Sequence, residues 1–292
     1  MTALRAQLPG ERWHFSQGPI DLVIGAVGDG DVTRAAHEAA WRRFVGLLPE
    51  LVAELPLLRA PVREHNPLAG PVARRMWAAC HPFRSEFITP MAAVAGAVAE
   101  EIIACYQRPG VRRAWVNNGG DIALHLASEE CLRVGLCADV AGLRGDEHGL
   151  QVDATFTVQA AMPVRGVATS GWRGRSFSLG IADSVTVLAR TASEADAAAT
   201  VIANAVNLRD PRIQRRPACE LKDDSDLGAI PVTVDVPPLE PALVQRAIEA
   251  GLARARGLQA AGLVHDVAIV CQGRFARLGR PVRQPHPHPQ FG

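Results

Sequence analysis

The chain has 292 residues, enough to bury a large core in one domain or in two closely packed ones. Hydrophobic residues make up 48%, charged residues 21%, and the formal net charge is +1, so the composition excludes the basic surplus typical of nucleic-acid-binding proteins. No run approaches the roughly eighteen apolar residues of a membrane span, and residues 1–12 lack the pattern of a secretory signal, which predicts a cytoplasmic protein without membrane contact.

A hairpin and a long helix are the first predicted elements. Arg12–Phe15 and Ile20–Gly25 are apolar runs on either side of Gln17-Gly18-Pro19, which is typical of a β-hairpin. Asp31 is the expected N-cap of the helix, because apolar residues recur at helical spacing after it. Pro49 should end or kink this helix.

Two further helices are expected before the chain changes to strands. Asn66 before Pro67 predicts the start of the first, because proline fits the first helical position. The second should begin at Thr89 and run through Ala92 to Cys105, and its many small side chains predict close packing against a neighbour or a flat ligand.

From Arg112 the pattern changes to that of β-strands, with alternating apolar residues between Val152 and Val158. Gly145–Gly149 is expected to be a loop among them, and Ser193 to open a helix that reaches Ala205. The predicted strands are residues 114–116, 122–126, 132–138, 152–158 and 184–189.

The C-terminal part continues this mixture. Arg209–Gly228 is polar and predicts a surface excursion or a weak boundary inside a single domain of residues 1–280. Pro241–Leu258 predicts a helix and Val264–Cys271 a strand, while residues 281–292 are expected to be disordered. Helices between strands without a regular βαβ rhythm predict an α+β fold. The six cysteines lack Cys-x-x-Cys spacing, which argues against zinc, and most should be buried.

The first candidate functional motif is Asn117-Asn118-Gly119-Gly120-Asp121, directly after a predicted strand. Paired glycines can take positive φ and bring backbone N–H groups close to a phosphate or a flavin edge. Asn118 and Asp121 would then add side-chain hydrogen bonds. The structural alternative is an ordinary hairpin turn, which favours the same residues.

The second motif lies between Gly166 and Gly180 and combines hydroxyl residues with glycines and arginines. It contains Thr169-Ser170-Gly171, followed by Arg173 and Arg175. Arginine carries permanent charge and bonds phosphate oxygens in pairs, so Arg173 and Arg175 are candidate phosphate contacts. A solvated loop is the alternative.

The third motif is Asp196 with Thr200, one helical turn apart on the same face. A carboxylate and a hydroxyl at this spacing can converge on a hard cation such as magnesium. Alternatively, Thr200 bonds back to its own helix and Asp196 is favoured near the helix start by the dipole.

In this order along the chain, four stretches resemble an uncharacterised branch of the ApbE-like superfamily, whose known members are the FAD:protein FMN transferases. The match is densest between residues 90 and 207. The stretches are Pro90-Met91-Ala92-Ala93-Val94-Ala95-Gly96, Asn118-Gly119-Gly120-Asp121-Ile122, Thr169-Ser170-Gly171 with Ala182-Asp183, and Ala195-Asp196-Ala197-Ala198-Ala199-Thr200.

The resemblance implies an ApbE-like fold, mostly antiparallel sheet packed with helices, and a site for FAD or FMN with magnesium. Asp196 and Thr200 match the family's metal-binding pair, Gly119 and Gly120 a glycine pair at the flavin pocket, and Thr169-Ser170-Gly171 a turn that lines it. The implied activity is magnesium-dependent transfer of FMN, or of a nucleotidyl group, to a protein acceptor.

The chain also departs from the transferases. Ala95 stands where they carry a lysine, Glu100 matches their acidic residue only approximately, and their His-Ile-Ile-Asp-Pro segment is replaced by Trp172–Leu179. These departures favour the alternative of a non-catalytic flavin-binding or assembly protein on the same scaffold. A hydrolase with Asp121 or Asp183 as base is a third hypothesis. The sequence leaves the oligomeric state open.

Overall fold

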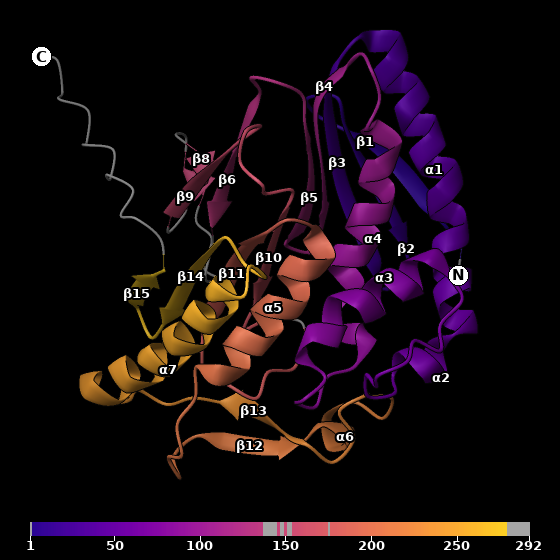
Figure 1. Ribbon diagram of the computed structural model, residues 1–292. Helices are drawn as coiled ribbons and strands as arrows, with labels where there is room; N and C mark the ends of the chain where they lie inside the picture. The colour runs from indigo at the N-terminus through magenta and orange to yellow at the C-terminus, as the bar shows by residue number, and fades with distance from the viewer. Residues whose placement is uncertain (1, 137–144, 147–148, 151–153, 175, 279–292) are drawn as a thin grey trace, which may run out of the picture.

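The computed structural model describes residues 2–136, 145–146, 149–150, 154–174 and 176–278. Among these residues, nine strands form one antiparallel sheet in the order β1-β2-β3-β4-β5-β10-β11-β14-β15 (Figure 1). The strands are β1 Leu4–Leu8, β2 Arg12–Gln17, β3 Ile20–Gly28, β4 Val111–Asn118, β5 Asp121–Leu126, β10 Gly166–Ser170, β11 Ser184–Ala189, β14 Asp266–Cys271 and β15 Arg274–Arg277.

The main helices cover one face of this sheet (Figure 1). The large hydrophobic core lies between the two layers, because alternate strand residues such as Val187 and Val267 point toward the helices. This arrangement confirms the predicted α+β class with a mostly antiparallel sheet. The helices are α1 Gly30–Ala53, α2 Leu55–Leu58, α3 Pro71–Cys80, α4 Val94–Ile103, α5 Ala192–Ala205, α6 Ala218–Leu221 and α7 Pro241–Ala260, with 3-10 turns at His81–Phe83, Pro90–Ala93 and Ala104–Tyr106.

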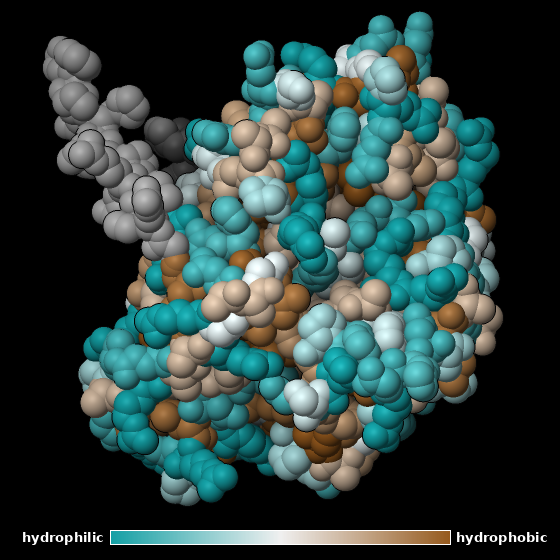
Figure 2. Space-filling model, in the orientation of Figure 1, coloured by the Kyte–Doolittle hydropathy of each residue, from teal (hydrophilic) through white to brown (hydrophobic). Residues whose placement is uncertain are grey.

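A second, smaller core lies on the opposite face of the sheet. There the hairpin of β6 (Cys131–Leu136) and β9 (Ala154–Gln159) covers residues such as Leu124 and Leu188, which alternate with residues of the main core. The alternation predicted for the strand that is now β9 is correct, since Phe156 and Val158 are both buried. The face seen in Figure 2 carries hydrophilic side chains over most of its extent.

The start and the end of α1 differ from the prediction. Asp29 is the N-cap, and its carboxylate accepts from the N–H groups of Asp31 and Val32. Asp31 lies in the first turn instead. Pro49 does not end the helix, which continues to Ala53. Leu47 and Leu51 on either side of Pro49 are both buried, and we attribute the continuation to this burial, which offsets a proline cost of roughly 3 kcal/mol.

The next helix also begins later than predicted. α3 starts at Pro71 after the cap Gly70, so proline does stand at the first position, but not at Pro67. Asn66 forms a local turn in which its side chain accepts from the N–H of Leu68 at 2.9 Å. An Asn-Pro pair can form such a turn as readily as a helix start.

The structure refines one further prediction and corrects two others. The polar segment after Arg209 contains β12 (Gln214–Pro217) and α6, and β12 pairs with β13 (Pro231–Asp235). The loop predicted at Gly145–Gly149 includes two short paired strands, β7 Gly145–Asp146 and β8 Gly149–Leu150. Of the described cysteines, Cys80 and Cys271 are buried, whereas Cys105 is half-buried and Cys131 and Cys219 are exposed.

The strand β1 was not predicted at all, and the predicted disordered tail lies outside the described residues. None of the helices in the described part of the chain combines the length and the apolar character that crossing a membrane requires.

Candidate functional site

The paired glycines form the turn between β4 and β5. Gly119 and Gly120 have φ values of +66° and +114°, a conformation that glycine adopts without the strain imposed on other residues. The N–H of Gly120 donates to Asn117 Oδ1 at 2.8 Å. A Cβ atom placed on Gly120 would meet no heavy atom within 4 Å, so this backbone borders open space. The motif is therefore a hairpin turn, as the structural alternative predicted, and its backbone is also open to a ligand.

The residues on either side of this turn hold it in place. Asn118 and Asp121 are both buried. The Nδ2 group of Asn118 donates to the carbonyl oxygen of Ala95 in α4 at 3.1 Å. The Oδ1 atom of Asp121 accepts from the N–H of Thr169 in β10 at 3.0 Å. The turn is thus tied to α4 on one side and to the Thr169-Ser170-Gly171 segment on the other.

Asp196 reaches the same place from α5. Its Oδ2 atom accepts from the N–H of Gly96 at 2.9 Å, and the N–H of Ala95 donates to the same carboxylate. Ala95 and Gly96 lie in the first turn of α4, where N–H groups have no partners inside the helix. The cap residue of α4, Ala93, offers no side-chain acceptor. Asp196 therefore caps α4 from a neighbouring helix.

The surroundings of Asp196 make its negative charge costly. Burial raises the pKa of Asp196 well above its usual value, and the charge of Asp121 raises this pKa further. The two donating N–H groups of α4 offset this effect in part. Two carboxylates held near each other in this way favour a bound cation or a shared proton.

Thr200 follows Asp196 by one turn of α5, and both residues are half-buried, unlike Ala197, Ala198 and Ala199 between them. In the described residues no cluster of three histidine, cysteine or acidic side chains could hold a metal. The oxygen atoms of Asp196 and Thr200 are the candidate ligands that the sequence predicted, and Asp121 adds its charge nearby. Hard oxygen donors of this kind suit magnesium, which keeps several waters in such sites.

The end of β10 and the loop after it border the candidate site beside the β4–β5 turn. Thr169 Oγ1 is 2.8 Å from Thr186 Oγ1 in β11. A Cβ atom on Gly171 would lie 2.3 Å from the carbonyl oxygen of Asp183, so only glycine allows this close approach. The sequence-predicted Ser170 is half-buried at the end of the strand.

The arginines of this loop were predicted to contact phosphate. Arg173 instead forms an ion pair with Asp183 Oδ1 at 2.9 Å and lies over the ring of Trp172. Asp183 Oδ2 also accepts from the N–H of Gln272 at 2.5 Å, so this carboxylate fastens the loop to the turn after β14. Arg175 lies outside the described residues.

The structure thus brings together six of the predicted residues around the start of α4: Asn118, Gly119, Gly120, Asp121, Thr169 and Asp196. No sequence pattern indicated the N–H groups of Ala95 and Gly96 as part of the site. None indicated that the Cys80 thiol lies near Asp196 either. Burial raises the pKa of Cys80, and the charge of Asp196 adds to this effect, so the thiol is protonated at neutral pH.

The α+β fold and the match to a family model over nearly the whole chain define a protein of the ApbE-like class. The family model described as "AbpE bacteria" matches residues 5–277, and the chain belongs to that family. A UPF0280 protein of Methanopyrus kandleri is 36% identical over 209 residues, which cover 70% of this chain and 78% of that protein. A UPF0280 protein of Methanothermobacter thermautotrophicus is 39% identical over 156 residues, 53% of this chain and 56% of the relative.

Among solved structures, a mutant of the flavin transferase ApbE from Vibrio cholerae is similar with a TM-score of 0.47 and 12% identity, covering 94% of this chain and 95% of that one. The apo form of the flavinyl transferase ApbE from Pseudomonas stutzeri has a TM-score of 0.43 and 12% identity, with 94% and 92% covered.

Proposed function

We propose that this protein binds FAD, FMN or a related nucleotide beside the Gly119-Gly120 turn, with magnesium held by Asp196 and Thr200. One observation carries the proposal: Asp121 lies close enough to Asp196 to raise its pKa, beside the Gly119-Gly120 turn, where the backbone of Gly120 borders open space. Two carboxylates whose negative charges lie near each other are costly without a cation, and their oxygens are ligands that magnesium prefers. Membership of the ApbE-like family supports the same site.

Each residue of the site has a task in this proposal. Asp196 and Thr200 hold the metal, and Asp121 adds a second negative charge beside it. The backbone of Gly119 and Gly120 approaches the ligand closely, and Asn118 fixes that turn against α4. Magnesium bound here would offset the charge of a pyrophosphate. The activity we propose is magnesium-dependent transfer of FMN or a nucleotidyl group to a hydroxyl of a protein acceptor.

Replacement of Asp196 by asparagine tests the metal assignment. Asp196→Asn keeps the shape and one acceptor for the Gly96 N–H but removes the charge. We expect FAD affinity in the presence of magnesium, measured by calorimetry, to fall more than about tenfold, while the smaller affinity without magnesium stays unchanged. Unchanged magnesium-dependent affinity would rule out Asp196 as a ligand.

The matched control is Glu194→Gln, two residues earlier on the same helix. Glu194 is half-buried, and its carboxylate forms an ion pair at 2.9 Å with the exposed side chain of Arg190. This variant also removes one negative charge from α5. We expect its magnesium-dependent affinity for FAD to equal that of the unmodified protein.

The alternative function is flavin binding without catalysis. Two observations favour it: Ala95 stands where the transferases carry a lysine, and Asp196 already has a structural task as the cap of α4. Incubation with FAD, magnesium and a threonine-containing acceptor peptide separates the two. Release of AMP supports the transferase, whereas tight binding with intact FAD supports the binding protein.

The third hypothesis was a hydrolase with Asp121 or Asp183 as base. The structure disfavours Asp183 in this role, because its carboxylate already pairs with Arg173 and accepts from the N–H of Gln272.

A further inference from the structure

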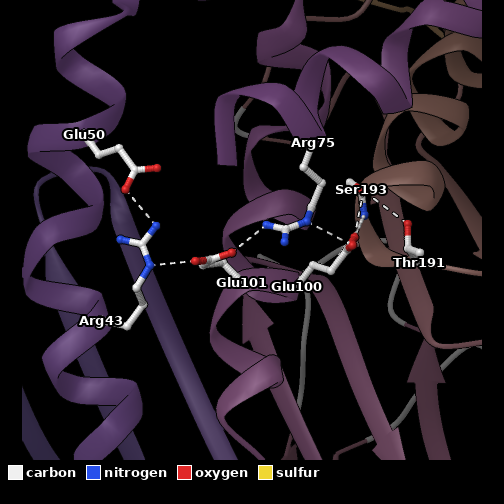
Figure 3. Close-up of polar contacts among 7 residues, drawn as sticks. All are labelled: Arg43, Glu50, Arg75, Glu100, Glu101, Thr191 and Ser193. Carbon is white, nitrogen blue, oxygen red and sulfur yellow. Dashed lines mark hydrogen bonds and ion pairs between the residues drawn. The ribbon is translucent and has the colours of Figure 1, made fainter. Parts of the chain in front are cut away.

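Helices α4 and α5 each supply an acidic side chain to the start of the other. Asp196 of α5 accepts from Gly96 in the first turn of α4. In return, Glu100 of α4 accepts from the hydroxyl of Ser193 at 2.7 Å and from its N–H at 3.3 Å, in the first turn of α5 (Figure 3). Ser193 is buried, so these bonds are shielded from solvent.

The two helices touch through their backbones at this point. A Cβ atom on Gly96 would lie 2.2 Å from the carbonyl oxygen of Ala192. No side chain separates the helices there, and a shift of the first turn of α5 therefore moves Asp196 directly. Asp196 follows Ser193 by three residues, which places it about 4.5 Å further along the helix axis.

Glu100 is itself held by a charged network that extends across the helix layer (Figure 3). Its Oε1 atom is 3.1 Å from Nε of Arg75 in α3, and Arg75 also pairs with Glu101 at 2.8 Å. Glu101 continues the network to Arg43 of α1 at 2.6 Å. The side chains of Arg75, Glu100 and Glu101 are 27%, 23% and 16% exposed, so solvent screens these pairs less than typical surface pairs.

Contacts on two sides hold the Asp196 side chain and the helix that carries it. The N–H groups of Ala95 and Gly96 hold Asp196 from one side. The bonds between Glu100 and Ser193 fix the helix that carries it.

We propose that Glu100 and Ser193 are positioning residues for the Asp196 carboxylate, with Arg75 holding Glu100 in the correct orientation. They set how strongly the site binds magnesium without touching the ion. The magnesium part rests on the proposed function, whereas the placement of Asp196 against Gly96 does not.

Two variants and one matched control test this inference. Glu100→Gln keeps the shape of the side chain and weakens its bonds to Ser193 and Arg75, and Ser193→Ala removes only the hydroxyl. The control, Glu101→Gln, alters the neighbouring residue of the same network, which pairs with Arg75 and Arg43 and has no described contact with α5. If Glu100→Gln does not fold, Ser193→Ala alone carries the comparison.

The first measurement is hydrogen exchange of the Gly96 amide by NMR, because this N–H donates to Asp196. We expect exchange to be at least about tenfold faster in Glu100→Gln and Ser193→Ala, with the rate in Glu101→Gln within about twofold of the unmodified protein. Equal acceleration in all three variants would overturn the inference, because it would mean that the network stabilises the fold in general. Unchanged exchange in Ser193→Ala would overturn it as well.

The second measurement is magnesium affinity by calorimetry. Residues that orient a metal ligand typically change affinity by about 10- to 100-fold, and we expect a loss in this range for Glu100→Gln. An affinity equal to that of Glu101→Gln would contradict the inference. If the unmodified protein binds no magnesium, the proposed function fails, and the Gly96 amide still decides whether Glu100 and Ser193 place Asp196.

Discussion

The Asp196 side chain serves two neighbours at the scale of single residues. It caps α4 through the N–H groups of Ala95 and Gly96, and it faces the charge of Asp121. A cap alone requires only an acceptor oxygen, which asparagine also supplies. The negative charge is therefore unnecessary for the cap and costly where it lies. A bound cation or a shared proton would relieve this cost, and the function that we propose assigns the cation.

A buried histidine gives a prediction that does not depend on the site. His37 is buried in α1, and its Nδ1 atom is 2.7 Å from the hydroxyl oxygen of Tyr106. Burial lowers the pKa of His37, although the nearby Glu38 opposes this effect. The unfolded chain therefore binds a proton at a pH where the folded protein does not. This contribution to stability is present above about pH 6.5, the pKa of the unfolded histidine, and is lost as the pH falls below that value toward the lowered pKa of the folded protein.

Urea unfolding at pH 7.5 and pH 5.5 measures this loss. We expect the unmodified protein to lose more stability over this interval than His37→Gln, in which the side chain cannot titrate. Each unit by which the pKa is lowered corresponds to about 1.4 kcal/mol. Comparison of the two proteins cancels the titration of all other groups. Parallel losses in both would show that His37 is not responsible.

At the scale of elements, small residues decide how closely the helices approach. The buried face of α5 is largely alanine, and α4 contributes Gly96 at the contact. Small side chains lower the distance between helix axes and let backbone atoms meet. The sequence-based prediction that the small-residue helix packs closely against a neighbour is confirmed, and the neighbour is α5.

Helix α7 contains a matched pair of glycines that tests this dependence on packing. A Cβ atom on Gly251 would lie 2.3 Å from Val206 Cγ2, whereas one on Gly257 would meet no atom within 4 Å. We expect Gly251→Ala to destabilise by about 1–3 kcal/mol through overpacking. Gly257→Ala should instead stabilise by about 0.5–1 kcal/mol, because alanine favours the helix. Chemical denaturation measures both, and equal signs would contradict the close contact between Gly251 and Val206.

At the scale of the whole molecule, one sheet separates two cores of unequal size. The larger core lies under the helices, and the smaller one lies under the β6–β9 hairpin. The candidate site is on the helix side, where α4, α5 and the β4–β5 turn meet. Local openings of the hairpin should therefore leave the site intact.

Hydrogen exchange after Phe156→Ala tests this separation. Phe156 is buried in the small core, and the guanidinium of Arg277 lies 4.4 Å from its ring centre. We expect faster exchange of β6 and β9 amides, while exchange in β4 and β5 and the affinity for FAD remain unchanged. Acceleration throughout the sheet would show that the two cores unfold together.

Much of the element order could be predicted because it depends on neighbours in the chain. Short runs of strand-forming residues located β4, β5 and β11, alternation located β9, and helical spacing located α7. β1 was missed although its residues alternate between apolar and polar; the run is only five residues long, and almost all of it is exposed. Pro49 was expected to end or kink α1, and the helix does not end there because Leu47 and Leu51 on either side of it are buried.

The candidate site, like the element order, was predictable in part. Residues with suitable chemistry could be recognised without the fold: a glycine turn, and a carboxylate and a hydroxyl at helical spacing. The fold was needed to show that Asp121 lies near Asp196, that Arg173 pairs with Asp183, and that Asp196 caps a helix whose donor is 100 residues away. Spacing along a helix or strand is set by backbone geometry, whereas contact between distant segments is set by how the whole core packs.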